Sequence, residues 1–276
     1  MSSPVNDKRI VQQLIVRLYI HHIPKHRIDS DVERIQMDFI LGFASEHYID
    51  GKGDGRFNPT WEVDPSSIER VKKFKQGHPE VRVVISIGGV GTEFPFNPVE
   101  NLVWIDNAAK SIQHIIELYD DDQSDQNIID GIDIHYDVIN SSHDDFSYCI
   151  GQVIRQLKLD KHLAFKMVVS IAPTQVVESY YHILYLNNKD IIDLVDYQFY
   201  SQKFSTKEEI IELYKKLVVN YTPALVLPGI PGDPILNETI KYLLEQNAIP
   251  GVFFWDSEDS INAPKTISLE HLLQNI

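Results

Sequence analysis

The chain has 276 residues, of which 43% are hydrophobic and 24% are charged, and its formal net charge is −15. These values predict one globular domain over residues 1–276, with residues 1–10 as a flexible tail, and they argue against a disordered chain. The negative charge argues against nucleic acid and membranes as partners, because both attract basic surfaces.

Cysteine content and the first residues bear on the cellular compartment. Cys149 is the only cysteine, so no disulfide can form within the chain. The N-terminal residues lack the apolar run that follows a basic segment in a signal peptide, and no stretch reaches the roughly 18 to 20 apolar residues of a membrane span. We therefore expect a reducing compartment, with the cytoplasm first and a storage vacuole as the alternative.

Strand and helix signals alternate along the chain. Strands are expected at residues 13–20, 39–45, 82–87, 131–136, 166–172, 194–200, 224–227 and 252–255. Apolar residues at helical spacing predict helices that include residues 108–119, 146–157 and 210–218. Eight strands alternating with helices predict an α/β fold, a (β/α)8 TIM barrel, which about 250 residues normally build. Residues 51–63, rich in glycine, are predicted to form a long loop after the second strand.

An octet in the fourth expected strand carries the clearest chemical signal. Residues 130–137 read Asp-Gly-Ile-Asp-Ile-His-Tyr-Asp. Alternation along a strand turns Asp133, His135 and Asp137 to one face and three apolar residues to the other. Burying charge is costly unless the groups are paired or face a cavity, so we expect this face to carry the functional site.

The octet resembles the signature of glycoside hydrolase family 18, the chitinase-like barrels. That signature reads Asp-Gly-hydrophobic-Asp-hydrophobic-Asp-x-Glu, and its last Glu is the general acid. Here His135 stands in place of the third Asp, and Asp137 stands in place of the Glu. Further segments resemble the family in family order, at residues 39–53, 78–89, 193–202 and 250–260. With the variant octet, they resemble the narbonin-like subgroup of that family.

The resemblance also implies which residues line the site. The vestigial catalytic group would be Asp130, Asp133, His135 and Asp137. The substrate-binding residues would be Tyr19, Ser86, Gly88, Gly89, Gln198, Tyr200 and Trp255. In the family, the glycines let the sugar approach the backbone, the tyrosine binds the N-acetyl group and the tryptophan forms the floor under the sugar. We expect these residues at the carboxyl ends of the strands, where barrel enzymes place their catalytic groups.

Both changes in the octet weaken the family reaction, in which the sugar's own acetamide attacks the anomeric carbon while the acid protonates the leaving oxygen. Asp137 is one methylene shorter than Glu, and a displacement of about 1 Å can cost on the order of 10²-fold in rate. His135 replaces the Asp that would accept the acetamide N–H. We therefore expect a catalytically degenerate protein in which Asp133, His135 and Asp137 form an ion-pair network.

Several roles stay open for such a chain. The main expectation is a storage-type or binding protein without hydrolase turnover. One alternative is a weak chitin or N-acetylglucosaminide hydrolase that uses Asp137 as its acid. Another is a lectin for chitooligosaccharides or a scaffold for a protein partner, so the expected partners are N-acetylglucosamine oligosaccharides or another protein.

Neither a cofactor nor a metal is expected. The cluster of His21, His22 and His26 has no carboxylate or cysteine at a ligand spacing. The acidic run at residues 119–125 lacks the glycine and the final glutamate of a calcium-binding loop.

Overall fold

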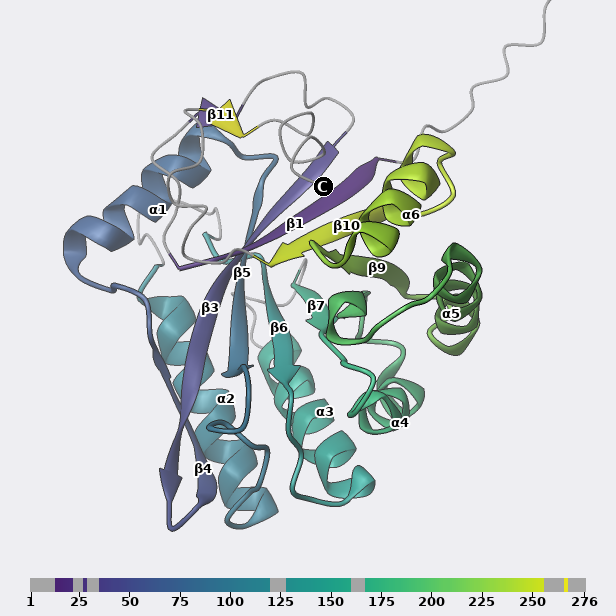
Figure 1. Ribbon diagram of the computed structural model, residues 1–276. Coiled ribbons are helices and arrows are strands. Elements are labelled where there is room, and N and C mark those ends of the chain that lie inside the picture. Colours follow the sequence, from purple (N-terminus) through teal and green to yellow (C-terminus); the bar gives the residue numbers. More distant parts are fainter. Residues whose placement is uncertain are drawn as a thin grey trace, which may run out of the picture.

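Eight parallel strands close into a barrel in the computed structural model of the chain, which describes residues 13–21, 27–28, 35–119, 128–159, 167–255 and 266–267 (Figure 1). The strands are β1 (Leu14–Ile20), β3 (Ile35–Ile49), β5 (Arg82–Gly89), β6 (Gly131–Tyr136), β7 (Val168–Ile171), β8 (Leu194–Tyr197), β9 (Leu225–Ile230) and β10 (Gly251–Trp255). They neighbour one another in the order β1, β10, β9, β8, β7, β6, β5, β3, and the pairing of β1 with β3 closes the ring. The predicted (β/α)8 barrel is confirmed.

Some expectations fall outside the described residues or in a minor element. The predicted tail at residues 1–10, the histidines His22 and His26, and the acidic run from residue 120 onward lie outside the described ranges. Two short strands, β2 (Arg27–Ile28) and β11 (Thr266–Ile267), pair in parallel with each other and not with the barrel.

Six α-helices follow the strands in the described part of the chain. They are α1 (Pro65–Gly77), α2 (Asn101–Glu117), α3 (His143–Leu159), α4 (Glu178–Asn188), α5 (Lys207–Asn220) and α6 (Pro234–Glu245). The three helices expected from apolar spacing correspond to α2, α3 and α5. At the start of α1, the carboxylate of Asp64 accepts the backbone N–H groups of Ser66 and Ser67, and a proline fills the first helical position, where no donor is needed.

Residues 51–63 are not the long loop that their glycine content suggested. Most of them form β4 (Lys52–Pro59), which pairs antiparallel with the far end of β3, and this hairpin projects beyond the barrel at the bottom of Figure 1. Asp50 and Gly51 make its two-residue turn, with φ angles of 51° and 74°. Such a turn needs positive φ at both positions, and Asp-Gly is one of the pairs that adopt it readily. The Asp50-Gly51 pair therefore predicts a hairpin, whereas the glycine content of residues 51–63 had suggested a loop.

Charged side chains occupy the middle of the barrel. Arg17 on β1 lies between Asp38 on β3 and Asp196 on β8, and all three are fully buried. The Nε atom of Arg17 is 3.0 Å from Oδ2 of Asp38, and its Nη1 donates to Asp196. Burial raises the pKa of Asp196, and the nearby Arg17 only partly opposes that effect. Sequence reasoning did not identify these three residues.

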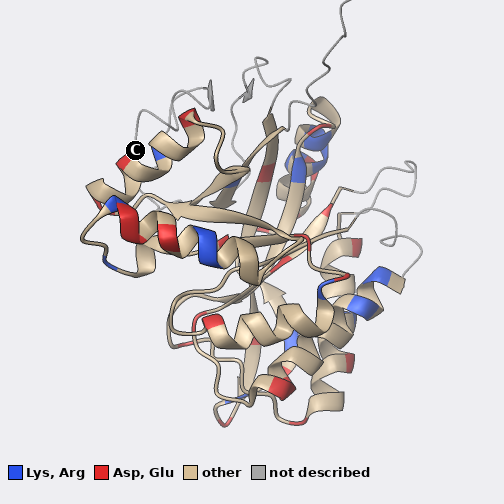
Figure 2. Cartoon of the chain, turned by 90° about the vertical axis from the view of Figure 1, so that its right-hand side faces the viewer, with Lys and Arg blue, Asp and Glu red and all other residues tan. Residues whose placement is uncertain are grey.

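The apolar core is divided by the barrel wall. The larger cluster packs the outward faces of the strands against the helices, and a smaller one fills the barrel interior with residues such as Ile15, Ile40, Leu227 and Phe253. In the view of Figure 2, acidic and basic residues are both spread along the outer helices. Among the described residues, no helix has the length and apolar character needed to cross a membrane.

Candidate functional site

Polar and aromatic side chains gather at the carboxyl ends of β1, β6, β8 and β10. Tyr19, His135 and Trp255 lie in the last residues of β1, β6 and β10, while Asp137 directly follows β6 and Gln198 directly follows β8. Tyr19 and Trp255 are paired in register across the β1–β10 contact. The structure thus brings five of the predicted residues into one cluster, which we call the strand-end cluster.

Asp133 lies in the same barrel interior but is held by hydroxyl groups. It accepts hydrogen bonds from Tyr19 Oη at 2.8 Å, Ser86 Oγ at 2.7 Å and Ser170 Oγ at 2.6 Å. These three donors satisfy a carboxylate that is fully buried. The expected ion-pair network is therefore wrong for Asp133, because hydroxyls and not the imidazole of His135 are its partners.

Aromatic rings surround the imidazole of His135, which is fully buried. Its centroid lies 5.6 Å from that of Tyr19, 5.1 Å from that of Phe43 and 5.6 Å from that of Trp255. The Nδ1 atom of His135 has no hydrogen-bond partner among the described residues. The imidazole is thus packed as an aromatic ring on most sides and is polar only toward its Nε2 atom.

Phe43 belongs to this aromatic group although no sequence pattern pointed to it. Strict alternation from Ile40, which faces the barrel interior, would send Phe43 outward. The pairing of β3 with β5 shifts register between Leu41 and Ala44, and Phe43 joins Ile40 in the interior cluster. An extra residue in one strand changes which face the following side chains occupy.

Three groups surround the carboxylate of Asp137. Gly91 donates its backbone N–H to Oδ2 at 2.9 Å, Gln198 donates from Nε2 to Oδ1 at 3.2 Å, and Nε2 of His135 lies 3.6 Å from Oδ1. Burial raises the pKa of Asp137, but the interactions with His135, Gly91 and Gln198 together outweigh burial and leave the pKa below its ordinary value. The side chain is 21% exposed, so it also reaches solvent.

The side-chain amide of Gln198 lies between His135, Asp137 and the end of β7. Its Nε2 donates to the carbonyl oxygen of Ala172 at 2.9 Å and to Asp137 at 3.2 Å, which uses both amide protons. Nε2 of His135 lies 3.3 Å from the same nitrogen. The amide of Gln198 therefore contacts His135, Asp137 and Ala172 at the same time.

Gly88 and Gly89 end β5 beside this cluster, but protein atoms fill the space next to them. Gly88 has a φ of 106°, and a Cβ atom there would lie 2.1 Å from the carbonyl oxygen of His135. A Cβ atom at Gly89 would lie 2.6 Å from the ring of Phe94. The glycines therefore admit a neighbouring strand and an aromatic ring, whereas the resemblance implied that they make room for a sugar.

Tyr200 lies on η1 (Phe199–Ser201), a short 3-10 helix, and not on the strand expected over residues 194–200. Its ring packs against Phe253 with centroids 6.0 Å apart, and its hydroxyl is buried without a hydrogen-bond partner among the described residues. Burial raises the pKa of this hydroxyl well above its ordinary value, and the carboxylates of Asp137 and Asp196 raise it further. A buried hydroxyl without a partner is costly, which makes Tyr200 a group that a ligand could satisfy.

Asp130 does not belong to the strand-end cluster. It precedes β6 and therefore lies at the opposite end of the barrel from Asp137. Its Oδ2 accepts from Nζ of Lys75 at 2.7 Å and from the backbone N–H of Val83 at 2.8 Å. Burial raises the pKa of Asp130, while the ion pair with Lys75 opposes the rise. These contacts tie α1 to β5 and β6.

Other reactive side chains add little to the site. Within the described ranges, no group of three or more His, Cys, Asp or Glu side chains is placed to hold a metal ion. Cys149 is buried, and burial raises the pKa of its thiol to about 12, which disfavours the reactive thiolate.

Comparisons with known proteins agree with this architecture. The model of the family described as glycosyl hydrolases family 18 matches residues 32–250. Chitinase 1 of Tulipa saxatilis subsp. bakeri is 30% identical over 267 residues, which cover 90% of this chain and 80% of that protein.

Solved structures give the same picture. The catalytic domain of a family GH18 chitinase from the fern Peteris ryukyuensis superposes with a TM-score of 0.74 at 28% identity, covering 95% of this chain and 98% of that one. Human YKL-39, described as a pseudo-chitinase with retained chitooligosaccharide binding properties, superposes with a TM-score of 0.63 at 12% identity, covering 88% and 92%. At that identity the likeness to YKL-39 concerns the fold alone.

Proposed function

This chain belongs to glycosyl hydrolase family 18, and from that premise we propose that it binds N-acetylglucosamine oligosaccharides at the strand-end cluster without hydrolysing them. The proposal rests on one observation above all. Asp137 stands in the position of the family's acid, and its carboxylate accepts hydrogen bonds from Gly91 and Gln198.

Loss of turnover follows from the protonation state of Asp137. A general acid must hold a proton near the working pH, so active sites raise the pKa of such a carboxyl. Here Gly91 and Gln198 donate to both carboxylate oxygens, and the pKa lies below its ordinary value. The side chain is also one methylene shorter than the Glu of the family motif. Asp137 is thus both ionised and retracted, and both properties oppose protonation of a leaving oxygen.

Binding is supported by groups that a sugar would satisfy. The hydroxyl of Tyr200 has no partner among the described residues and matches the family tyrosine that binds the N-acetyl group. Trp255 is only partly buried, and its ring stacks on Phe43 at 5.8 Å and packs against Tyr19 at 5.1 Å. A rigid aromatic face with a few polar groups around it suits the apolar C–H surface of a sugar ring. YKL-39, a protein of this fold, is likewise described as a pseudo-chitinase that retains chitooligosaccharide binding.

Titration calorimetry with N-acetylglucosamine tetramer and hexamer, alongside reducing-end release from the same oligomers between pH 4 and 8, tests the proposal. We expect saturable binding and no detectable product. The variant Tyr200→Phe tests the binding site, because it removes only the unpaired hydroxyl and should weaken binding while the fold stays intact.

Each other result selects a different role. Product release within tenfold of an active family chitinase would make the protein a hydrolase that uses Asp137 as its acid. Absence of both binding and product would contradict the proposed site and favour a storage-type role, which makes no demand on this cluster.

A further inference from the structure

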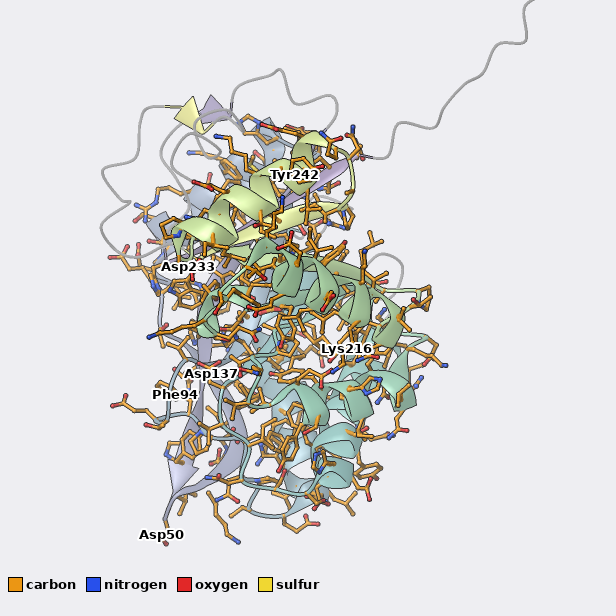
Figure 3. All side chains as sticks on the ribbon, turned by 45° about the vertical axis from the view of Figure 1, so that its right-hand side comes forward. Asp50, Phe94, Asp137, Lys216, Asp233 and Tyr242 are labelled. Carbon is orange, nitrogen blue, oxygen red and sulfur yellow. The ribbon has the colours of Figure 1, made fainter. Side chains whose placement is uncertain are left out.

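The segment that follows β5, residues 90–96, is fastened to the end of β6. Gly91 donates to Asp137, as described above, and the backbone N–H of Phe96 donates to the carbonyl oxygen of Val138 at 2.9 Å. Phe96 is fully buried, so its side chain anchors the segment in the core. The segment therefore has a fixed position relative to Asp137, and in the view of Figure 3 Phe94 and Asp137 lie at the same edge of the molecule.

Phe94 is seated directly on the backbone at the end of β5. The Cβ position of Gly89 falls 2.6 Å from the Phe94 ring, so the ring occupies the volume that any larger residue at position 89 would need. The hydroxyl of Tyr48 donates to the carbonyl oxygen of the next residue, Pro95, at 2.9 Å. Phe94 itself is only partly buried. The ring of Phe94 thus packs on Gly89, and the hydrogen bond from Tyr48 to Pro95 holds the adjoining backbone, while the residue stays partly exposed.

Asp137 keeps acceptor capacity on the solvent side. A carboxylate can accept about four hydrogen bonds, and Oδ2 of Asp137 accepts only the Gly91 N–H among the described residues. The side chain is 21% exposed. Residues 90–96 therefore supply both the N–H that holds Asp137 and the ring of Phe94, and both side chains are partly exposed.

We propose that Phe94 and Asp137 form one saccharide subsite, in which the C–H face of an N-acetylhexosamine unit packs on Phe94 and a hydroxyl or amide N–H of the same unit donates to Asp137. This inference rests on the proposed function and gives Asp137 a role as a binding acceptor in place of the acid role. Sugars combine an apolar face with a rim of donors, and this pair presents the matching ring and acceptor. Phe94 is then a residue that contributes to the affinity for the ligand.

The test compares the affinities of three variants with that of the full wild-type chain for N-acetylglucosamine hexamer by titration calorimetry. Phe94→Leu keeps apolar volume over Gly89 but removes the flat ring, and we expect it to weaken binding about tenfold. Phe94→Tyr keeps the ring and should bind within about twofold of wild type. Val90→Ala is the matched control, because Val90 is an exposed apolar residue of the same segment, 41% exposed, and should leave affinity unchanged. Thermal melts of all four proteins confirm that each is folded.

The outcomes separate this inference from the proposed function. If wild type binds and Phe94→Leu binds equally well, the subsite is wrong and the proposed function stands. If Val90→Ala weakens binding as much as Phe94→Leu does, the effect belongs to the whole segment, and the assignment to Phe94 is overturned. If wild type binds no oligosaccharide, both proposals fail together.

Discussion

Gln198 donates a hydrogen bond from Nε2 to Oδ1 of Asp137 at 3.2 Å, although the two residues lie 61 positions apart in the chain. The same nitrogen donates to the carbonyl oxygen of Ala172 at 2.9 Å, so one amide joins the ends of three strands, β6, β7 and β8. Gln198 is 4% exposed. Together with His135 and Gly91, this contact holds the pKa of Asp137 below its ordinary value.

Gln198→Leu should therefore raise the pKa of Asp137 and lower stability. The leucine cannot donate to Asp137, and it leaves the carbonyl oxygen of Ala172 without this donor, a loss of about 1–3 kcal/mol. The carboxyl carbon shift of Asp137 in an NMR pH titration and urea unfolding measure the two effects. Gln175→Leu is the control, because Gln175 is exposed and should change neither. An unmoved Asp137 titration in Gln198→Leu would show that the amide does not influence the carboxylate.

The double variant His135→Asp with Asp137→Glu restores the two family motif residues. We expect wild type to give no detectable product from N-acetylglucosamine hexamer and the double variant to release product at least tenfold above the detection limit. The reason is that the longer acid regains about 1 Å of reach. Reducing-end release between pH 4 and 8 measures this. If the double variant is folded but inert, other residues also block turnover, and its loss cannot be assigned to these two residues alone.

Asp130→Asn should lower stability without changing ligand affinity. The substitution removes the charge that pairs with Lys75, whose side chain is almost completely buried, and we expect a loss of about 1–3 kcal/mol in the free energy of unfolding. Because Asp130 lies at the opposite end of the barrel from Asp137, the affinity for N-acetylglucosamine hexamer should stay at the wild-type value. Urea unfolding and titration calorimetry on the same preparation test both parts. A weakened affinity in a variant of normal stability would mean that Asp130 acts on the binding site.

Glu46, on the part of β3 that extends beyond the barrel, is buried among hydrogen-bond donors. Its carboxylate accepts from Nε1 of Trp104 at 2.5 Å, the backbone N–H of Gly55 at 3.0 Å and the hydroxyl of Tyr136 at 3.2 Å. Burial raises the pKa of Glu46 to about 7, although these three donors lower it. The group thus joins the β3–β4 hairpin to α2 and to the end of β6.

Wild-type stability should therefore fall as pH rises from 4.5 to 8. The folded pKa of Glu46, about 7, lies above the ordinary value of 4.5, so the stabilising contribution is full below pH 4.5 and is lost as pH rises through 7. The difference between these two pKa values corresponds to a loss of about 3 kcal/mol in the free energy of unfolding. Glu46→Gln removes the titrating group, so its free energy of unfolding should fall less over this range, as measured by urea unfolding at pH 5 and pH 8. The same fall in both proteins would show that Glu46 does not control this pH dependence.

Local patterns in the sequence determined the barrel. The eight expected strands all occur, and the expected strand at residues 131–136 has the observed bounds of β6. Alternation of apolar and polar residues and helical spacing are local properties, so they can be read without knowing what packs against them. The same alternation placed Asp133 and His135 in the barrel interior, and the family resemblance placed Trp255 and Gln198 near them.

The partners of those residues depended on strands distant in the sequence, and only the tertiary structure decided them. Asp133 is held by hydroxyls from three other strands, and a register shift in β3 turns Phe43 toward His135. Alternation predicts which face of the strand a side chain occupies. It does not predict which residues of other strands lie beside it, because barrel closure and strand stagger determine those neighbours. For that reason the sequence located the ionisable face but could not show that Gln198, Gly91 and His135 hold Asp137 as an acceptor.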